Sequence, residues 1–297
     1  MLCRNEYLYT LKRDSYVVDV GDKLRSYGWR PDETIDCALG TNPFGAPASA
    51  REAYLAAVSV DFSRYPDPWA DKLREVLAHV WEAAGVTPEE IVVGPGSMGL
   101  LERLNKLFLF PGARVLGYAP QFSEYVSDAR ANGAVYTGVK LKGRRLEFSL
   151  TEFLAHLGPE LTLVYLDNPN NPTGQLISLD ALRVVLTQAL QHSVPVVVDE
   201  AYGDFVSPEN SAIHLVREFP NLVVTRSFSK GLGLAGLRVG YAVLSGELRS
   251  LYERVDLPFS VAEAAIKAAC VSARDTEFVE NSRTGVGQVK AELLAAL

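Results

Sequence analysis

The chain has 297 residues, of which 48% are hydrophobic and 22% charged, as is usual for a folded globular protein. Its net charge of −7 and the lack of a basic tract argue against a nucleic-acid partner. It has no apolar run of about 18 residues, no signal-peptide core and only three scattered cysteines (Cys3, Cys37 and Cys270), which predicts a cytoplasmic protein with reduced thiols, no disulfide framework and no metal site.

The N-terminal part contains two predicted helices and two proline-rich turns. Residues 1–40 carry no clear pattern, although a short strand is expected from about residue 36, before the Asn-Pro and glycine turn at 42–45. A helix is predicted from about residue 48 to 59, followed by Ser-Arg-Tyr-Pro-Asp-Pro at 63–68. Apolar residues at helical spacing predict a second helix over 69–84, which Gly85 ends.

Residues 91–99, Ile-Val-Val-Gly-Pro-Gly-Ser-Met-Gly, predict a strand, a turn and the start of a helix. Gly94 to Gly99 match Gly-x-Gly-x-x-Gly, a pattern that also occurs in dinucleotide sites. Such a site needs an acidic residue at the end of the next strand, whereas the strand predicted at 114–118 runs into Ala-Pro-Gln, so this alternative is disfavoured. An anion site remains, because free N–H groups at a helix N-terminus bind negative charge.

Two further buried strands end in polar residues. Residues 161–166 predict a strand, and Asp-Asn-Pro-Asn-Asn-Pro-Thr-Gly at 167–174 predicts the turn after it. A helix should follow from Ser178 to His192. Its expected inward face consists of Leu179, Leu182, Val185, Leu186 and Leu190. The apolar run 194–199 then ends in Asp199, a carboxylate that needs a cation or backbone hydrogen bonds in such a place.

The segment 225–241 connects two strands, predicted at 222–225 and 240–244, and contains Lys230 among four glycines. The glycines argue against a long helix and place Lys230 in a loop after a strand, where parallel α/β sheets bind ligands. A lysine held there beside a cationic neighbour can lose its proton and attack a carbonyl to form a Schiff base. Ser227 and Arg238 are residue types that bind phosphate. The alternative is a solvated Ser/Gly loop with one surface lysine.

The order of these segments indicates an α/β fold. Strands alternate with helices from Ile91 to Leu244, which favours a parallel sheet covered by helices. A helix is expected to open within 257–269. The last helical stretch runs to Leu297, with interruptions at Gly285 and Gly287.

Several of these motifs resemble those of one enzyme family. The run Ser227-x-Ser-Lys230, with Arg238 eight residues after the lysine, resembles the pyridoxal-phosphate lysine motif of the class I/II aminotransferases. The turn 168–174 matches their Asn-Pro-x-Asn-Pro-x-Gly signature, and segments 42–45 and 64–66 resemble their Asn-Pro-x-Gly and Arg-Tyr-Pro segments. Pro-x-Phe-x-Glu-Tyr at 120–125 is similar to the branch that contains histidinol-phosphate aminotransferases and threonine-phosphate decarboxylases. The resemblance covers about residues 36–297.

The resemblance implies a set of site residues. Lys230 would form an internal aldimine with pyridoxal 5'-phosphate, and Asp199 and Tyr202 would be the other catalytic residues. Asp199 would pair with the cofactor's ring nitrogen, while Tyr202 and Asn171 would bind its ring oxygen. The remaining cofactor contacts would be Gly96, Ser97, Met98, Phe122, Ser227, Arg238 and, from a partner subunit, Tyr65. Gly45 and Asn171 would contact the substrate, and no metal is implied.

The implied fold is that of a fold-type-I enzyme, a homodimer with a mostly parallel seven-stranded sheet and helices on both faces. Residues 1–40 would be an N-terminal arm or small-domain segment, 41–260 the large cofactor-binding domain, and 261–297 the start of a small domain whose remainder is missing. In the family, that remainder carries the arginine for the substrate α-carboxylate. Without that arginine, this chain is expected to hold pyridoxal phosphate but to bind its substrate weakly and transaminate poorly. Full activity would mean that an arginine of the N-terminal region (Arg4, Arg13 or Arg25) takes its place.

The implied reaction is transamination between an amino acid, or a similar and possibly phosphorylated amine, and a 2-oxo acid. Lys230 would move the proton between the substrate Cα and the cofactor. One alternative is a pyridoxal-phosphate-dependent decarboxylase of a phosphorylated amino acid, and another is a silent cofactor-binding or dimerisation module. Turnover with an amino donor and 2-oxoglutarate separates the enzyme from the silent module, and release of carbon dioxide identifies the decarboxylase.

Overall fold

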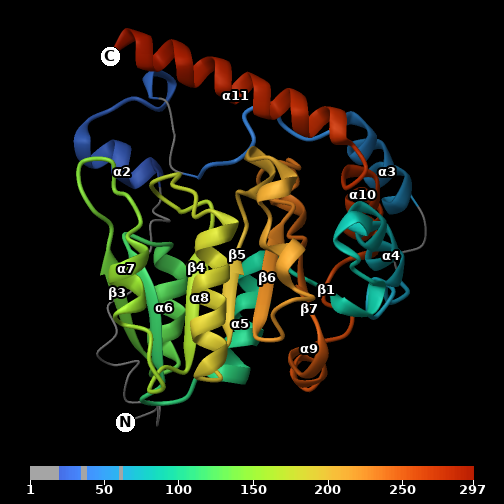
Figure 1. Cartoon of the computed structure of the whole chain (residues 1–297). Coiled ribbons are helices and arrows are strands. Elements are labelled where there is room, and N and C mark those ends of the chain that lie inside the picture. The colour runs from blue at the N-terminus through green and yellow to red at the C-terminus, as the bar shows by residue number, and fades with distance from the viewer. Residues whose placement is uncertain (1–19, 35–38, 60–62) are drawn as a thin grey trace, which may run out of the picture.

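Seven strands form one sheet through the middle of the molecule (Figure 1). The computed structural model describes residues 20–34, 39–59 and 63–297. Within these ranges the strands are β1 (Ile91–Gly94), β2 (Arg114–Ala119), β3 (Val135–Lys140), β4 (Leu163–Asp167), β5 (Val196–Asp199), β6 (Leu222–Ser227) and β7 (Gly240–Leu244). Their order across the sheet is β1-β7-β6-β5-β4-β2-β3.

The sheet is mostly parallel, as predicted. The pairs β2–β3, β2–β4, β4–β5 and β5–β6 are parallel, whereas β7 runs antiparallel to both β6 and β1. Parallel β4, β5 and β6 therefore end at the same edge, where the register pairs Asp167 with Asp199 and Asp199 with Thr225. Polar residues at the ends of buried strands are thus gathered at one edge of the sheet.

Helices cover both faces, which confirms the expected layers (Figure 1). Val196 and Val198 belong to one apolar cluster and Val197 to another, because successive strand residues point to opposite faces. The first face is covered by α3 (Ala48–Val58), α4 (Asp71–Val80), α7 (Leu150–Leu154), α8 (Leu179–Gln191) and α10 (Glu263–Ser272). The second is covered by α5 (Gly96–Phe108), α6 (Ser123–Ala131) and α9 (Gly246–Tyr252).

Two helices depart from their predicted limits or faces. α4 ends at Val80, and a 3₁₀ turn (Glu82–Ala84) leads to Gly85, whose φ of +69° ends the segment. In α8, Ser178 is the N-cap as predicted, and its hydroxyl accepts from the N–H of Ala181 at 3.3 Å. The inward position predicted for Leu190 is wrong, since its side chain is 40% exposed and Ala189 is buried instead.

The last helix, α11 (Thr276–Ala296), runs across one end of the sheet (Figure 1). It continues through Gly285 and Gly287, so the predicted interruption there is wrong. Glycine in a helix interior costs about 1 kcal/mol relative to alanine, which tertiary contacts can outweigh.

Several sequence predictions concern residues that the structure does not describe. Cys3, Cys37, Arg4 and Arg13 lie outside the described residues, as does the start of the strand expected near residue 36. Arg25 lies on α2 (Val20–Tyr27), and Cys270 is a free, partly buried thiol. Within the described ranges, no helix has the length and apolarity needed to cross a membrane. The division into arm, large domain and small-domain segment stays a prediction.

Candidate active site

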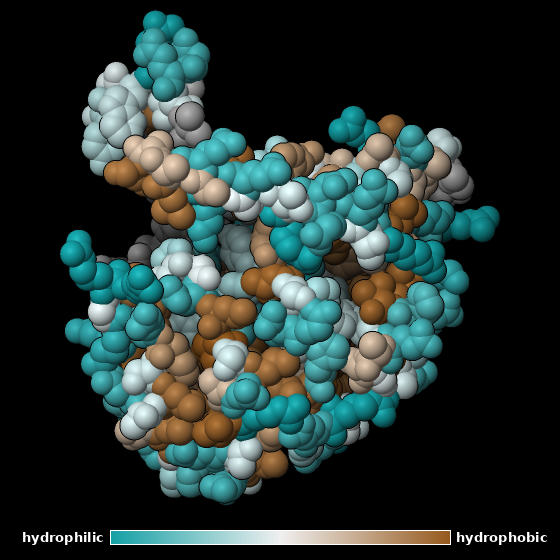
Figure 2. Space-filling model, turned by 45° about the horizontal axis from the view of Figure 1, so that its top comes forward, coloured by the Kyte–Doolittle hydropathy of each residue, from teal (hydrophilic) through white to brown (hydrophobic). Residues whose placement is uncertain are grey.

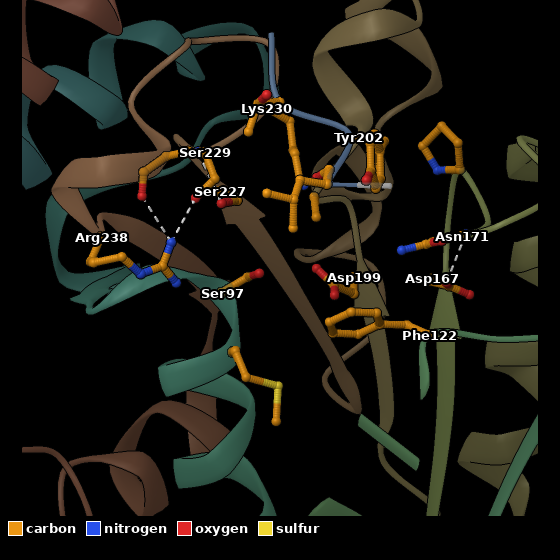
Figure 3. Close-up of a pocket in the computed structure, with 16 residues that line it drawn as sticks. Ser97, Phe122, Asp167, Asn171, Asp199, Tyr202, Ser227, Ser229, Lys230 and Arg238 are labelled. Atoms are coloured by element: carbon orange, nitrogen blue, oxygen red, sulfur yellow. Dashed lines mark hydrogen bonds between the residues drawn. The ribbon is translucent and has the colours of Figure 1, made fainter. Parts of the chain in front are cut away.

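A cavity of about 260 Å³ opens at the edge where β4, β5 and β6 end (Figure 3). Nine predicted site residues lie in its lining: Ser97, Met98, Phe122, Asn171, Asp199, Tyr202, Ser227, Lys230 and Arg238. They come from five separate parts of the chain, so only the folded chain brings them together. The space-filling view shows hollows in this side of the molecule, with mixed hydrophilic and hydrophobic rims (Figure 2).

Lys230 lies three residues beyond the end of β6 and points its amino group into the cavity (Figure 3). Nζ donates to the carbonyl of Leu39 at 2.7 Å and lies 5.1 Å from the centroid of the Tyr202 ring. Burial lowers the pKa of Lys230, and the positive charge of Arg238 lowers it further. More of the amine is therefore unprotonated, and so nucleophilic, than it would be in water.

Asp199 ends β5 and is almost fully buried, with 2% of its surface exposed. Its Oδ1 accepts from the Thr225 hydroxyl at 2.8 Å, and its Oδ2 accepts from the Tyr165 hydroxyl at 3.2 Å. Burial raises the pKa of Asp199 to about 7, and the nearby Asp167 adds to the increase, although the two hydroxyls oppose it. No cation within the described part of the chain forms an ion pair with Asp199. The site therefore suits a ligand with a protonated ring nitrogen.

Hydroxyls and one guanidinium gather on the opposite side of the cavity (Figure 3). Nη1 of Arg238 donates to the Ser229 hydroxyl at 3.1 Å, and the Ser227 hydroxyl accepts from the N–H of Ser229 at 3.1 Å. Ser97, at the N-terminal end of α5, also lines this side. A guanidinium, three hydroxyls and a helix N-terminus are the groups that bind phosphate.

Two glycines allow these groups to come close together. A Cβ at Gly96 would lie 2.5 Å from Nη2 of Arg238, and one at Gly240 would lie 2.6 Å from the backbone nitrogen of Ser97. Arg238 itself has a left-handed backbone, with φ of +53°. A side chain at either glycine would push the start of β7 and the arginine away from the α5 N-terminus.

Asp167, which is not among the predicted site residues, orders the side of the cavity opposite Arg238. Its Oδ2 accepts from the N–H of Asn171 at 2.8 Å, and its Oδ1 accepts from the side-chain amides of Asn170 at 3.0 Å and Gln121 at 3.1 Å. Burial raises the pKa of Asp167, and these hydrogen bonds oppose the increase. Through Asn171 and Gln121, the neighbour of Phe122, one carboxylate holds two cavity walls.

Three predicted site residues do not line this cavity. Gly96 is adjacent to Ser97 and in reach of Arg238, and Gly45 lies against Gly233 of the lysine loop. Tyr65 is 82% exposed, and its ring packs on Phe259 with 4.8 Å between centroids. None of the predicted roles of these residues is tested by their placement.

The structure adds seven lining residues to the predicted set: Leu39, Thr41, Asp167, Pro169, Ala201, Ser229 and Ala235. Ser229 lies inside the motif around Lys230, and Asp167 ends a buried strand as Asp199 does, so both could have been found by the same arguments. No local sequence pattern marks Leu39 and Thr41 as site residues, because they lie far from Lys230 along the chain and approach it only in the folded protein.

A family model described as aminotransferase class I and II matches residues 32–297. Histidinol-phosphate aminotransferase 2 of Ralstonia nicotianae is 37% identical over 265 residues, which are 89% of this chain and 69% of that relative. A histidinol-phosphate aminotransferase of Methanococcoides burtonii is 37% identical over 268 residues, covering 89% and 71%.

Solved structures show the same similarity. Histidinol-phosphate aminotransferase from Sinorhizobium meliloti in complex with pyridoxal 5'-phosphate superposes with a TM-score of 0.80 at 25% identity, covering 95% of this chain and 74% of that one. A Thermus thermophilus aspartate aminotransferase mutant complexed with tryptophan gives a TM-score of 0.85 at 22% identity, over 99% and 79%, and shows a shared fold.

Proposed function

The chain belongs to the class I and II aminotransferases, which are pyridoxal-phosphate-dependent enzymes, and we propose that it exchanges an amino group between histidinol phosphate, or a closely similar phosphorylated amine, and a 2-oxo acid. The names of the relatives carry the choice of substrate, since both relatives described above are called histidinol-phosphate aminotransferases. The comparisons support transamination and give no support to a decarboxylase or a silent module.

The residues of the cavity fit the cofactor, and we assign its contacts from them. Lys230 has an amine of lowered pKa, and Asp199 is a buried carboxyl without a cationic partner among the described residues. Arg238, Ser227 and the α5 N-terminus are the proposed phosphate site, and Phe122 and Asn171 the proposed contacts to the ring. When bound, pyridoxal phosphate supplies a carbonyl that accepts an amine and a ring that takes up the electron pair released at Cα.

In this proposal the protein's own groups move two protons. Lys230 accepts and returns the Cα proton at Nζ, and the Leu39 carbonyl holds that nitrogen at 2.7 Å when it is free. Burial raises the pKa of Asp199 to about 7, so this carboxyl would be able to share a proton with a ring nitrogen placed against it. The Tyr202 ring, 5.1 Å from Nζ, limits where the lysine can point.

A second cavity supports the choice of an anionic substrate. It has a volume of about 680 Å³ and shares Pro169, Asn171 and Tyr202 with the cofactor cavity. Arg283 and Lys290 of α11 belong to its lining, although Arg283 also pairs with Glu280. Arg283 also donates to the Asp204 carbonyl at 3.0 Å. In a chain with a net charge of −7, a cavity that contains two cations in its lining and shares residues with the cofactor cavity favours a phosphorylated amine.

We expect histidinol phosphate to react with 2-oxoglutarate with a kcat/KM about 10- to 100-fold above that of unphosphorylated histidinol, because charge-assisted hydrogen bonds are worth about 1.5–3 kcal/mol. Coupled steady-state assays on the purified chain measure both substrates. Equal kcat/KM values would contradict phosphate recognition. Release of carbon dioxide from a phosphorylated amino acid would support the decarboxylase instead, and no turnover with any amine would support the silent module.

The surface around Tyr65 supports a homodimer. Tyr65 packs on Phe259, whose N–H donates to the Pro68 carbonyl at 3.0 Å, so two segments far apart in sequence lie side by side. Leu257 and Trp69 on these segments are 58% and 43% exposed. We propose that a second copy of the chain covers this apolar surface and that Tyr65 reaches the cofactor phosphate of that copy.

Mixing the separately inactive variants Tyr65→Phe and Lys230→Ala should restore about a quarter of wild-type activity, because random exchange makes half of the dimers hybrid and each hybrid has one intact site. Activity is measured before and after subunit exchange, which native mass spectrometry verifies. Each variant mixed with itself is the control. If verified hybrids stay inactive, Tyr65 does not act in the partner's site.

A further inference from the structure

Residues 39–45 form a strap beside the cofactor cavity, and the strap contacts the reactive lysine directly. The Leu39 carbonyl accepts the hydrogen bond from Nζ of Lys230, and Thr41 also lines the cavity. Between them, a Cβ at Gly40 would lie 2.6 Å from the Tyr202 hydroxyl, so the backbone passes close to that side chain. The position of the strap therefore sets where the acceptor for Lys230 lies.

Asn42, in the middle of the strap, joins three segments that are distant in sequence. Only 7% of its surface is exposed, and its Nδ2 donates to the Gly231 carbonyl at 2.9 Å and to the Ser282 hydroxyl at 3.0 Å. Its Oδ1 accepts from the N–H of Phe44 at 2.9 Å, which fixes the path of the strap. One amide thus connects the strap, the residue after Lys230, and α11.

Phe44 makes a second contact between the strap and α11. A Cβ at Gly285 would lie against the end of the Phe44 ring, so a side chain there would displace that ring. Gly287, two residues further on, has no neighbour within 4 Å of such a Cβ. The lack of a side chain at Gly285 therefore allows the strap to pack on α11, at the low helix propensity of glycine.

We propose that Asn42 is a positioning residue of this enzyme, which makes the place of the Lys230 amino group depend on the place of α11. The inference rests on the proposed function only in taking Lys230 as the amine that receives the cofactor. Ser282 is 2% exposed, and the next residue, Arg283, lines the cavity proposed for the substrate. A substrate that moves α11 would therefore also move the strap, and with it the Leu39 carbonyl.

The first test compares Asn42→Ala and Ser282→Ala in the full chain loaded with pyridoxal phosphate. Asn42→Ala removes three hydrogen bonds and should weaken cofactor binding on the order of tenfold, whereas Ser282→Ala removes only the bond to α11 and should weaken it a few-fold. Both should also shift the pH midpoint at which the bound cofactor changes its absorbance, because the surroundings of Nζ change. A residue that only stabilises the fold would lower Tm without shifting this midpoint.

A matched pair on α11 keeps the inference testable if Asn42→Ala does not fold. Gly285→Ala and Gly287→Ala raise helix propensity by a similar amount, but only the first places a methyl group against Phe44. We expect Gly285→Ala to shift the absorbance midpoint, measured without substrate, in the same direction as Ser282→Ala. Gly287 lines the second cavity, but a Cβ there would have no neighbour within 4 Å, so Gly287→Ala should keep the wild-type midpoint of the substrate-free enzyme.

The inference would be overturned if Asn42→Ala, Ser282→Ala and Gly285→Ala all kept the absorbance midpoint and the cofactor dissociation constant of the wild type. Equal shifts in the two glycine variants would also overturn it, because the effect would then come from the helix and not from the strap. A wild-type chain that binds no cofactor at Lys230 would instead refute the proposed function, so the two failures are distinguishable.

Discussion

Lys230→Ala is expected to reduce the rate of amino transfer by about 10⁴-fold or more, because general acid–base catalysis alone contributes about 10²–10⁴-fold and the variant also loses the nucleophile. Cofactor binding should weaken but persist, since Arg238, Ser227 and the α5 N-terminus are unchanged. Single-turnover absorbance measurements report the rate, and equilibrium dialysis reports cofactor affinity.

Two further experiments separate the role of Lys230 from a general loss of charge. Lys267→Ala removes a half-exposed lysine that lies 3.5 Å from Glu263 on α10, and should leave turnover unchanged. Borohydride reduction of the wild type, followed by peptide mass spectrometry, should place the cofactor on Lys230. An adduct on another lysine, or on none, would refute the assignment.

Asp199→Asn should lower turnover by about 10²-fold or more, equivalent to about 2.7 kcal/mol, while cofactor affinity changes far less. An amide cannot share a proton with a ring nitrogen as a carboxyl can, whereas the phosphate contacts lie on the other side of the cavity. Asp167→Asn is the matched comparison, because Asp167 is the buried neighbour in register but holds Asn171 and Gln121. A near wild-type rate for Asp199→Asn would make Asp199 merely structural.

The raised pKa of Asp199 also predicts how the stability of the cofactor-free protein depends on pH. The folded-state pKa of about 7 lies above the ordinary value of 3.8, so the unfolded chain releases this proton first as the pH rises. The contribution of Asp199 to the free energy of unfolding is therefore fully present below about pH 4 and is lost as the pH rises from about 4 to 7. Above about pH 7 this free energy no longer changes because of Asp199. Urea unfolding measures the free energy of unfolding of the wild type and of Asp199→Asn at each pH. The difference between the two proteins should change only between about pH 4 and 7.

The sequence by itself determined the architecture and most of the cavity lining. The buried runs 161–166, 194–199 and 222–225 predict neighbouring strands, because β-branched and apolar residues without alternation are buried on both faces of a parallel sheet. Strand ends in such a sheet share one edge, which is why Asp199 and Lys230 could be assigned to one site. The edge strand β3 went unpredicted, since its residues are mostly partly buried or exposed and carry no continuous apolar run.

Only the tertiary structure decided which side chains hold the catalytic groups in place. Asn42 meets its partners across 189 and 240 residues of sequence, and no local spacing encodes such a contact. The same holds for Gly285, which sequence propensity marked as a break in the helix and which instead lies inside α11, with the Phe44 ring against it. Local patterns determine backbone conformation and burial, whereas hydrogen bonds between distant segments depend on how the whole chain closes around the site.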